Sequence, residues 1–346
     1  MPREALPVGA YVRHALCPLP EERTGGVTVA LLEVEHLKKY FPSPRGVVHA
    51  VDDVTFSIEK GKTLGLVGES GCGKSTLGRT IIHLLESTDG VIRFEGEDVT
   101  HPSKQRMRKL REDMQIIFQD PYSSLNPRLT IQDTIMEPLK LSGRFKADAL
   151  AKEADRLMDL AGIEKRFRMS YPHELDGGRR QRVGIARALA LMPKFIVCDE
   201  PVSALDVSIQ AQILNLLMDL QEEYSLTYIF VTHDLSVVRH ISTDICVMYL
   251  GQMVETCPTK ELFDHPFHPY TKALLSAILT VDIHKKNERI LLKGEINSPI
   301  NPKPGCRFAQ RCPYATEECR QPVPLQEIRP GHFVACCHAK EINQLD

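Results

Sequence analysis

Residues 68–76 read Gly68-Glu69-Ser70-Gly71-Cys72-Gly73-Lys74-Ser75-Thr76, and they match the phosphate-loop pattern G-x-x-x-x-G-K-[ST] at every fixed position. An apolar, β-prone run at 63–67 precedes them, and apolar residues at helical spacing follow over 76–85. Strand, loop and helix therefore occur in the order that a phosphate loop requires. The sequence predicts a nucleoside triphosphate site between this strand and this helix.

The residues of the loop have different tasks. Glycines at positions 68, 71 and 73 let backbone N–H groups turn inward around phosphate groups. Lys74 is placed to reach the outer two phosphates, and Ser75 is placed to offer its hydroxyl to Mg²⁺. We therefore expect all of residues 68–76 to contribute to nucleotide binding.

The composition is that of a large globular protein. The chain has 346 residues, of which 42% are hydrophobic and 25% are charged, and its formal net charge is -2. This charge lacks the basic footprint of a nucleic-acid-binding domain, so we expect no nucleic-acid partner. No apolar run approaches the roughly 20 residues of a membrane-spanning helix, so any membrane role is expected to come through partners. Residues 1–30 lack periodicity and are rich in Pro and Gly, which predicts a disordered tail, either native or an overlong start.

Strands and helices alternate along the rest of the chain. Two strands, 32–40 and 47–58, are predicted before the phosphate loop. Apolar residues recur at helical spacing over 131–171, with a stop at Gly162, which predicts an inserted helical subdomain at about 122–192. The continuous apolarity of 195–199 is typical of a buried parallel strand. Further strands are expected at 91–94, 114–118, 227–231 and 244–249, and helices at 104–111, 183–190, 209–224 and 235–241. This alternation predicts an α/β fold with one nucleotide-binding unit.

An acidic pair ends the buried strand at 195–199. Phosphoryl transfer needs a carboxylate near Mg²⁺ and a group that activates water, and Asp199 and Glu200 fit these two tasks. We expect the phosphate loop to lie on a strand adjacent to that of this acidic pair. His233 ends the next strand in sequence, so we expect it at the same sheet edge. The pattern predicts a catalytic site that includes Lys74, Glu200 and His233.

Residues 32–256 resemble the nucleotide-binding subunit of an ABC transporter, because several motifs of that family occur in order. The resemblance implies a P-loop NTPase fold with Mg²⁺ and ATP at residues 68–75, the Walker A loop. It further implies that Tyr40 stacks on the base, Gln119 lies near Mg²⁺, Asp199 holds Mg²⁺, Glu200 activates water and His233 touches the γ-phosphate. The loop at 120–128 and the helical insertion are implied to contact the membrane partner.

The signature motif departs from the family pattern. Where the family reads Leu-Ser-Gly-Gly-Gln, this chain has Leu175-Asp176-Gly177-Gly178-Arg179. In the family this motif closes the ATP site of a second subunit, so Asp176, Gly177 and Gly178 are implied to contact nucleotide there. Two unit charges about 4 Å apart at an effective dielectric near 20 repel by about 4 kcal/mol. We therefore hypothesise a heterodimer with unequal ATP sites, in which the site closed by Asp176 is slow or regulatory. The alternative is that Asp176 simply caps the signature helix.

The C-terminal part, predicted as an extension over 259–346, resembles that of ATP-binding subunits from oligopeptide, dipeptide and nickel importers. The stretches 265–275 and 294–302 carry this resemblance, and residues 68–79 look most like the F-type member of a D/F pair. The resemblance implies peptide import as the function, with nickel import as an alternative. It also implies a D-type ATP-binding partner, two membrane permeases, an extracytoplasmic peptide-binding protein and a peripheral position at the cytoplasmic face of the membrane.

A cysteine cluster lies in this extension. Cys306, Cys312, Cys319 and Cys336 are separated by five, six and sixteen residues, with Cys337 and His338 adjacent as alternatives. Four thiolates in a Pro- and Gly-rich segment predict a metal site. The spacing is wider than the C-x₂-C of zinc ribbons, so a [4Fe-4S] cluster is favoured over zinc and over unliganded thiols. Its expected role is structural, since metal binding can supply folding free energy to a segment with few apolar residues.

Two other classes of function compete with an importer ATPase. ABC proteins that act in DNA repair or on the ribosome usually have two cassettes or a long coiled-coil insertion, and this sequence has neither. A regulatory nucleotide-binding subunit with little turnover is suggested by Asp176 but opposed by Glu200 and His233. The sequence thus favours an enzyme, an ATPase of peptide transport.

Overall fold

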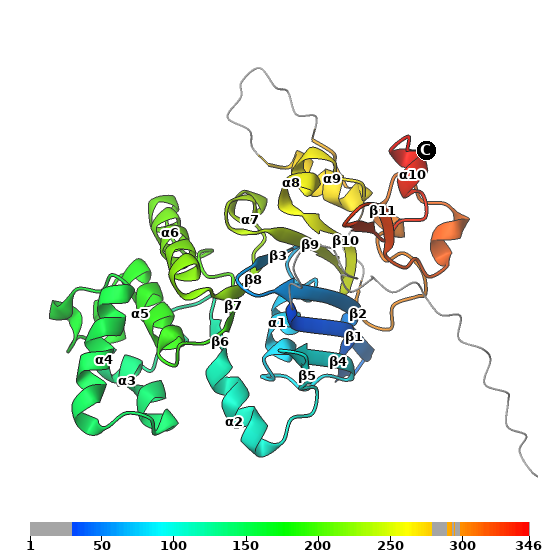
Figure 1. Ribbon diagram of the computed structural model, residues 1–346. Helices are drawn as coiled ribbons and strands as arrows, with labels where there is room; N and C mark the ends of the chain where they lie inside the picture. Colours follow the sequence, from blue (N-terminus) through cyan, green and yellow to red (C-terminus); the bar gives the residue numbers. More distant parts are fainter. Residues whose placement is uncertain (1–29, 279–288, 293, 295–297, 346) are drawn as a thin grey trace, which may run out of the picture.

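The computed structural model describes residues 30–278, 289–292, 294 and 298–345 (Figure 1). The predicted tail at 1–30 lies outside the described residues except for Ala30, and so does part of the stretch 294–302. Among the described helices, none is long and apolar enough to cross a membrane.

The main sheet has eight strands in the order β11-β12-β10-β9-β3-β8-β7-β6. Strands β6, β7, β8, β3 and β9 pair in parallel, and β10, β12 and β11 add to them antiparallel. Every residue of β3, β7 and β8 is buried, as expected where helices cover both faces of a parallel sheet. The bounds are β3 Thr63–Val67, β6 Met114–Ile117, β7 Phe195–Asp199, β8 Thr227–Val231, β9 Asp244–Tyr249, β10 Gln252–Pro258, β11 Gln326–Arg329 and β12 His332–Val334.

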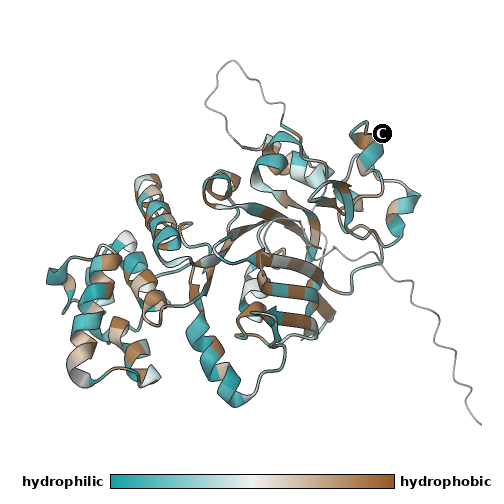
Figure 2. Cartoon of the chain, viewed as in Figure 1, coloured by the Kyte–Doolittle hydropathy of each residue, from teal (hydrophilic) through white to brown (hydrophobic). Residues whose placement is uncertain are grey.

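A second, antiparallel sheet has the order β2-β1-β4-β5. Its strands are β1 Ala30–Ser43, β2 Gly46–Glu59, β4 Asp89–Phe94 and β5 Glu97–Asp98. Helix α1, Lys74–Ile81, contacts β7 and β8 of the main sheet as well as β1 and β2. Its buried Leu77 belongs to a hydrophobic cluster with Leu32 of β1 and Val197 of β7, so one core joins the two sheets. In Figure 2 the strands of both sheets carry most of the hydrophobic colour, whereas helix α2, Lys104–Asp113, is mainly hydrophilic.

Helices α3, Ile131–Ser142, α4, Ala147–Leu160, and α5, Gly177–Leu189, lie together at one side of the main sheet (Figure 1). The predicted apolar spacing is confirmed, since Ala154, Leu157, Met158 and Ala161 are fully buried. The helical run over 131–171 is interrupted, because Gly143 adopts a left-handed conformation (φ 67°) and ends α3. The bounds 122–192 for a helical subdomain stay a prediction. Helices α6, Val207–Tyr224, and α7, Leu235–Ile241, follow β7 and β8, and the 3₁₀ turns η1 and η2 span Lys165–Phe167 and Pro172–Glu174.

The C-terminal residues pack on the main sheet. Strand β12 pairs with β10, so the sheet crosses the boundary that the sequence placed at residue 258. Buried Phe308 and Tyr270 join Val67 and Tyr249 in one hydrophobic cluster, which gives this segment a core shared with the rest of the molecule. Its helical elements are α8 Thr259–Asp264, α9 Pro269–Ser276, η3 Ala309–Arg311, η4 Glu317–Arg320 and α10 Ala339–Ile342.

Candidate functional site

The phosphate loop connects the carboxyl end of β3 to the N-terminus of α1. Gly73 has φ 106°, and a Cβ at this position would lie 2.0 Å from the Ala50 carbonyl oxygen, so only glycine fits. Lys74 is buried, and its Nζ donates to the carbonyl oxygens of Gly68 at 2.8 Å and Glu69 at 3.0 Å. The loop is thus folded around its own lysine.

A cavity brings the phosphate loop together with three of the predicted catalytic residues. Gln119 follows β6, Glu200 follows β7 and His233 follows β8, so all three come from carboxyl ends of parallel strands at one sheet edge. The lining residues are Val48, His49, Ala50, Ser70, Gly71, Gly73, Lys74, Ser75, Thr76, Gln119, Glu200, His233, Leu250, Gly251 and Pro299. One detail of the prediction was wrong: β8 lies between β3 and β7, so the strands of the phosphate loop and of Asp199 are not adjacent.

Asp199 is placed beside the phosphate loop. Its side chain is 1% exposed, and its Oδ1 accepts a hydrogen bond of 2.6 Å from the Ser75 hydroxyl. Arg79 of α1 donates to Oδ2 at 3.0 Å. A hydroxyl and a carboxylate in contact are the oxygen donors that Mg²⁺ prefers, so these residues fit the predicted metal role.

Glu200 is held by two polar neighbours. Gln119 Nε2 donates to Glu200 Oε2 at 2.9 Å, and His233 Nδ1 lies 3.4 Å from the same oxygen. Glu200 itself adopts a left-handed backbone conformation with φ 49°, which a non-glycine residue rarely does. Such local strain occurs most often at functional positions.

Tyr40 lies behind the cavity wall. Its hydroxyl donates to Asp52, and its ring stacks on His49 with centroids 4.0 Å apart. Burial and the nearby Asp52 carboxylate raise the pKa of Tyr40. His49 lines the cavity and Tyr40 does not, so base stacking by Tyr40 stays a prediction.

Asp176 caps helix α5. Its Oδ1 accepts a hydrogen bond of 2.8 Å from the Arg179 backbone N–H, and its Oδ2 pairs with the Arg179 guanidinium. Gly177 and Gly178 begin the helix, and none of these residues lines the cavity described above. The structure therefore keeps the signature motif apart from the chain's own phosphate loop.

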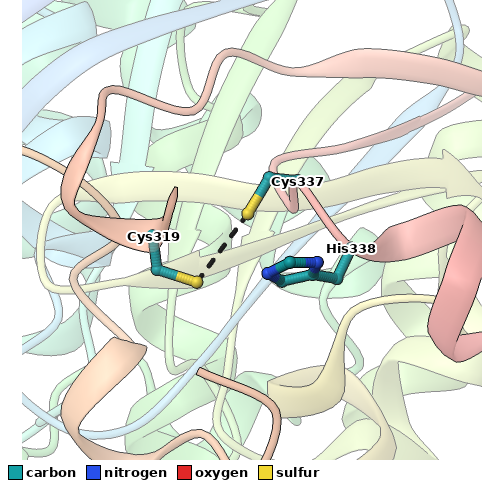
Figure 3. Close-up of side chains that lie close together, drawn as sticks. All are labelled: Cys319, Cys337 and His338. Carbon is teal, nitrogen blue, oxygen red and sulfur yellow. Dashed lines mark hydrogen bonds between the residues drawn. The ribbon is translucent and has the colours of Figure 1, made fainter. Parts of the chain in front are cut away.

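The predicted metal-binding cysteines converge. Cys319 Sγ and Cys337 Sγ are 3.7 Å apart, and with His338 they offer ligand atoms that all lie within 4.8 Å of one another (Figure 3). One small cavity is lined by all five cysteines of the tail and by His338; the cysteines are Cys306, Cys312, Cys319, Cys336 and Cys337. The two predicted alternatives, Cys337 and His338, belong to this close group, whereas of the four preferred ligands Cys319 belongs to it and Cys306, Cys312 and Cys336 do not.

The thiols of this cluster are disfavoured as isolated anions. Burial, with smaller effects from the other cysteines, raises the pKa of Cys306 and of Cys336 to about 11. Burial and Cys319 raise the pKa of Cys337 to about 12. A cation among these sulfur atoms would favour their thiolate forms, so the donor set fits a metal ion or cluster.

Three residues of the C-terminal part contact the nucleotide site, and the sequence alone did not identify them. Arg311 pairs with Glu69 of the phosphate loop, Tyr270 accepts from the Glu69 N–H, and Arg307 pairs with Asp52. The sequence offered one hint, since each arginine lies next to a cysteine of the cluster.

Solved structures share the fold of this chain. One is part of the ABC transporter complex cbiONQ from Clostridium perfringens, with a TM-score of 0.61 and 30% identity over 68% of this chain and 91% of that chain. Another is a dimeric ATP-binding cassette in a post-hydrolysis state bound to ADP and Pi, with a TM-score of 0.61 and 30% identity over 66% of this chain and 98% of that chain. The fold is therefore that of an ATP-binding cassette.

Family models and relatives narrow the class further. Residues 51–203 match the ABC transporter family, and 254–319 match the family described as oligopeptide/dipeptide transporter, C-terminal region. The oligopeptide transport ATP-binding protein AppF of Bacillus subtilis is 51% identical over 317 residues, covering 88% of this chain and 96% of that protein. OppF of the same organism, also an oligopeptide transport ATP-binding protein, is 48% identical over 91% of this chain and 98% of its own length. This chain belongs to the family of oligopeptide transport ATP-binding proteins, the ATPase subunits of ABC transporters.

Proposed function

We propose that this chain hydrolyses ATP to power the import of di- or oligopeptides through a membrane ABC transporter. The observation that carries the proposal is the single cavity in which the phosphate loop meets Gln119, Glu200 and His233. AppF and OppF are 51% and 48% identical to this chain over 96% and 98% of their own lengths, and both are named as oligopeptide transport proteins. These names support peptides as the cargo.

The chain's residues divide the work of nucleotide binding. The backbone N–H groups of 68–76 surround the phosphates, and Lys74 exchanges its bonds to loop carbonyls for bonds to phosphate oxygens. Ser75, Asp199 and Gln119 would hold Mg²⁺, and Tyr40 would support the base. Bound Mg²⁺ neutralises charge that develops on the phosphate oxygens.

Glu200 acts as the general base. A water oxygen bonds to the γ-phosphorus, the bond from that phosphorus to the bridging β-phosphate oxygen breaks, and Glu200 takes the water proton. Gln119 and His233, which both contact Glu200 Oε2, fix the carboxylate for this transfer.

In the proposed transporter, a second ATP-binding subunit lies against the signature motif of this chain. Asp176, Gly177 and Gly178 would face nucleotide on that subunit, with this chain as the F-type and its partner as the D-type member of a heterodimer. Two permeases and an extracytoplasmic peptide-binding protein complete the transporter, and this chain lies peripherally at the cytoplasmic face of the membrane. Its own parts are a nucleotide-binding domain at 31–258, with the helical subdomain at 122–192, and an extension at 259–346.

The test is the variant Glu200→Gln in the assembled transporter. Loss of the general base should lower ATP hydrolysis by at least about 10²-fold and abolish uptake of a radiolabelled oligopeptide, while ATP binding persists. The matched control is the corresponding substitution in the partner subunit. Unchanged hydrolysis with Glu200→Gln, together with its loss in the partner variant, would show that this chain is the regulatory half instead.

The regulatory alternative rests on the Asp176 carboxylate, which the signature motif would bring to the partner's nucleotide. Its hydrogen bond with the Arg179 backbone N–H favours the simpler reading, in which Asp176 caps helix α5. Nickel import is the other alternative. Uptake of Ni²⁺ rather than peptide by the same assembled transporter would decide for it.

We further propose that Cys306, Cys312, Cys319 and Cys336 hold a [4Fe-4S] cluster, with Cys337 able to replace Cys336. Their shared cavity supports this assignment. The close group of Cys319, Cys337 and His338 supports zinc as the alternative, because mixed Cys and His ligands are typical of zinc.

Metal analysis of anaerobically purified protein distinguishes the two. A cluster should give brown protein with absorbance at about 400 nm and with bound iron, and Cys306→Ser should remove the absorbance and the iron. Colourless protein with one zinc per chain, lost on His338→Ala but kept on Cys306→Ser, would overturn the iron–sulfur assignment.

A further inference from the structure

The short segment 306–312 joins the cysteine cavity to the nucleotide cavity. Its backbone is fixed at the cysteine end, where the Cys306 N–H donates to the Cys319 carbonyl at 2.8 Å. In its middle, Phe308 is 1% exposed and packs edge-on against Tyr249 with ring centroids 5.3 Å apart. The two arginines of the segment, Arg307 and Arg311, therefore project from a firmly held piece of backbone.

Arg311 holds the phosphate loop. Its guanidinium donates to both carboxylate oxygens of Glu69, at 2.7 and 3.1 Å, and its side chain is 9% exposed. The Glu69 backbone N–H donates to the Tyr270 hydroxyl at 2.9 Å, and the Glu69 carbonyl accepts from Lys74 Nζ at 3.0 Å. Glu69 is thus fixed through its side chain and its main chain, and a hydrogen bond joins it to Lys74, the lysine proposed to bind phosphate.

Arg307 contacts one wall of the nucleotide cavity. Its guanidinium, on a side chain 6% exposed, donates to the Asp52 carboxylate and to the Leu250 carbonyl. Asp52 also binds the Tyr40 hydroxyl and lies 3.3 Å from His49 Nδ1. Leu250 and His49 line the cavity. Arg307 therefore reaches the cavity wall directly through Leu250 and indirectly through Asp52, which also binds Tyr40, the residue predicted to stack on the base.

The ion pairs of Arg307 and Arg311 differ from an ordinary surface ion pair in how deeply the arginine side chains are buried. Bonds to Glu69 raise the pKa of Arg311, and burial lowers that of Arg307 against the effect of Asp52. Buried, charge-assisted, bidentate pairs fix geometry strongly. By contrast, Arg320 follows Cys319 in the same region but pairs with Glu317 in the open, with side chains 75% and 80% exposed. The buried pairs of Arg307 and Arg311 thus lie between the cysteine cavity and the nucleotide cavity, whereas the exposed pair of Arg320 does not reach the phosphate loop.

We propose that Arg307 and Arg311 are positioning residues of the nucleotide site, and that metal occupancy of the cysteine cluster sets nucleotide affinity through them. The inference rests on the proposed nucleotide and metal sites. Loss of metal frees Cys306 and Cys312, which flank the arginines in sequence, and so loosens the contacts to Glu69 and Asp52. Because such coupling is reciprocal, bound nucleotide must also slow the loss of metal.

The first experiment tests the arginines alone by equilibrium titration of the full-length chain with a fluorescent ATP analogue. Arg311→Ala, Arg307→Ala and Glu69→Gln should each weaken binding by about five- to tenfold. Arg311→Lys should recover part of the loss, and Arg311→Ala with Glu69→Gln should cost no more than either change alone. Arg320→Ala is the matched control and should stay within about twofold.

Affinities within about twofold of wild type for folded Arg311→Ala and Arg307→Ala would overturn the positioning role. If the alanine variants fail to fold, Glu69→Gln decides, since it keeps the size of the side chain and removes only its charge. A wild-type chain that binds no nucleotide refutes the proposed function itself.

The second experiment tests the coupling. Stripping metal with a chelator should weaken nucleotide binding of the wild-type chain, but should add little in the double variant Arg307→Ala with Arg311→Ala. Saturating nucleotide should in turn slow chelator-driven loss of iron or zinc. Equal affinity with and without metal overturns the coupling, and so does a chain that binds no metal, while the first experiment still decides the role of the arginines.

Discussion

Glu255 is a carboxylate that the fold surrounds completely. It is 0% exposed, and its oxygens accept from the backbone N–H groups of Phe267 at 2.7 Å and His268 at 3.0 Å and contact His332 Nε2 at 2.8 Å. A buried charge is tolerated only when it is paired and hydrogen-bonded, and Glu255 has three such partners. This one residue of β10 therefore holds the start of α9 and strand β12 in place.

Replacing this carboxylate should be costly. We expect Glu255→Gln to destabilise the chain by about 1 to 3 kcal/mol, because an amide cannot satisfy all three buried partners that the carboxylate contacts. Denaturant unfolding of the full chain measures the loss. Glu317→Gln, in an exposed pair, is the control and should change stability by less than about 1 kcal/mol. A similar small effect of Glu255→Gln would mean that the pair contributes little.

At the scale of elements, helix α5 shows how a motif combines local and tertiary demands. Asp176 supplies the N-cap that its residue type predicts. Gly178 is required by tertiary packing, because a Cβ at this position would lie 2.7 Å from Ile209 Cγ2 of α6. Gly184 of the same helix has no heavy atom within 4 Å of the corresponding point. Two glycines in one helix thus carry different constraints.

These two glycines make a matched pair of variants. Gly178→Ala should destabilise the protein by about 1 to 3 kcal/mol, since the methyl group forces α5 and α6 apart. Gly184→Ala should be neutral or stabilise by up to about 1 kcal/mol, because alanine favours the helix and meets open space. Thermal unfolding of both variants checks the difference. Equal effects would show that the α5–α6 contact is not tight.

For the whole molecule, sequence patterns predicted what depends on local order. The phosphate loop, the buried strand ending in Asp199 and the helical spacing around Leu157 all follow from neighbours in sequence, and the structure confirms those elements. The pairing of β10 with β12 could not be predicted, because it joins short strands far apart in the chain. The contact of Arg311 with Glu69 escaped for the same reason, since arginine side chains show no periodicity that reveals a distant partner.

Removal of strands β11 and β12 should therefore destabilise the main sheet as well as the C-terminal segment. A chain that ends after Gln321 lacks β11 and β12, so the edge of β10 is left unpaired and Glu255 loses His332. Unpaired strand edges promote association between chains. We expect this truncated chain to aggregate, as measured by size-exclusion chromatography of freshly purified protein. A soluble monomer with the thermal stability of the full chain would contradict this expectation.

The contact between Arg311 and Glu69 also has a consequence for the order of events during biosynthesis. The two residues are 242 positions apart. At translation rates of about 5 to 20 residues per second, the ribosome makes Arg311 roughly 12 to 50 seconds after Glu69. During that interval the phosphate loop lacks its contact with Arg311, so a newly made chain acquires its final nucleotide site only after residue 311 has been made.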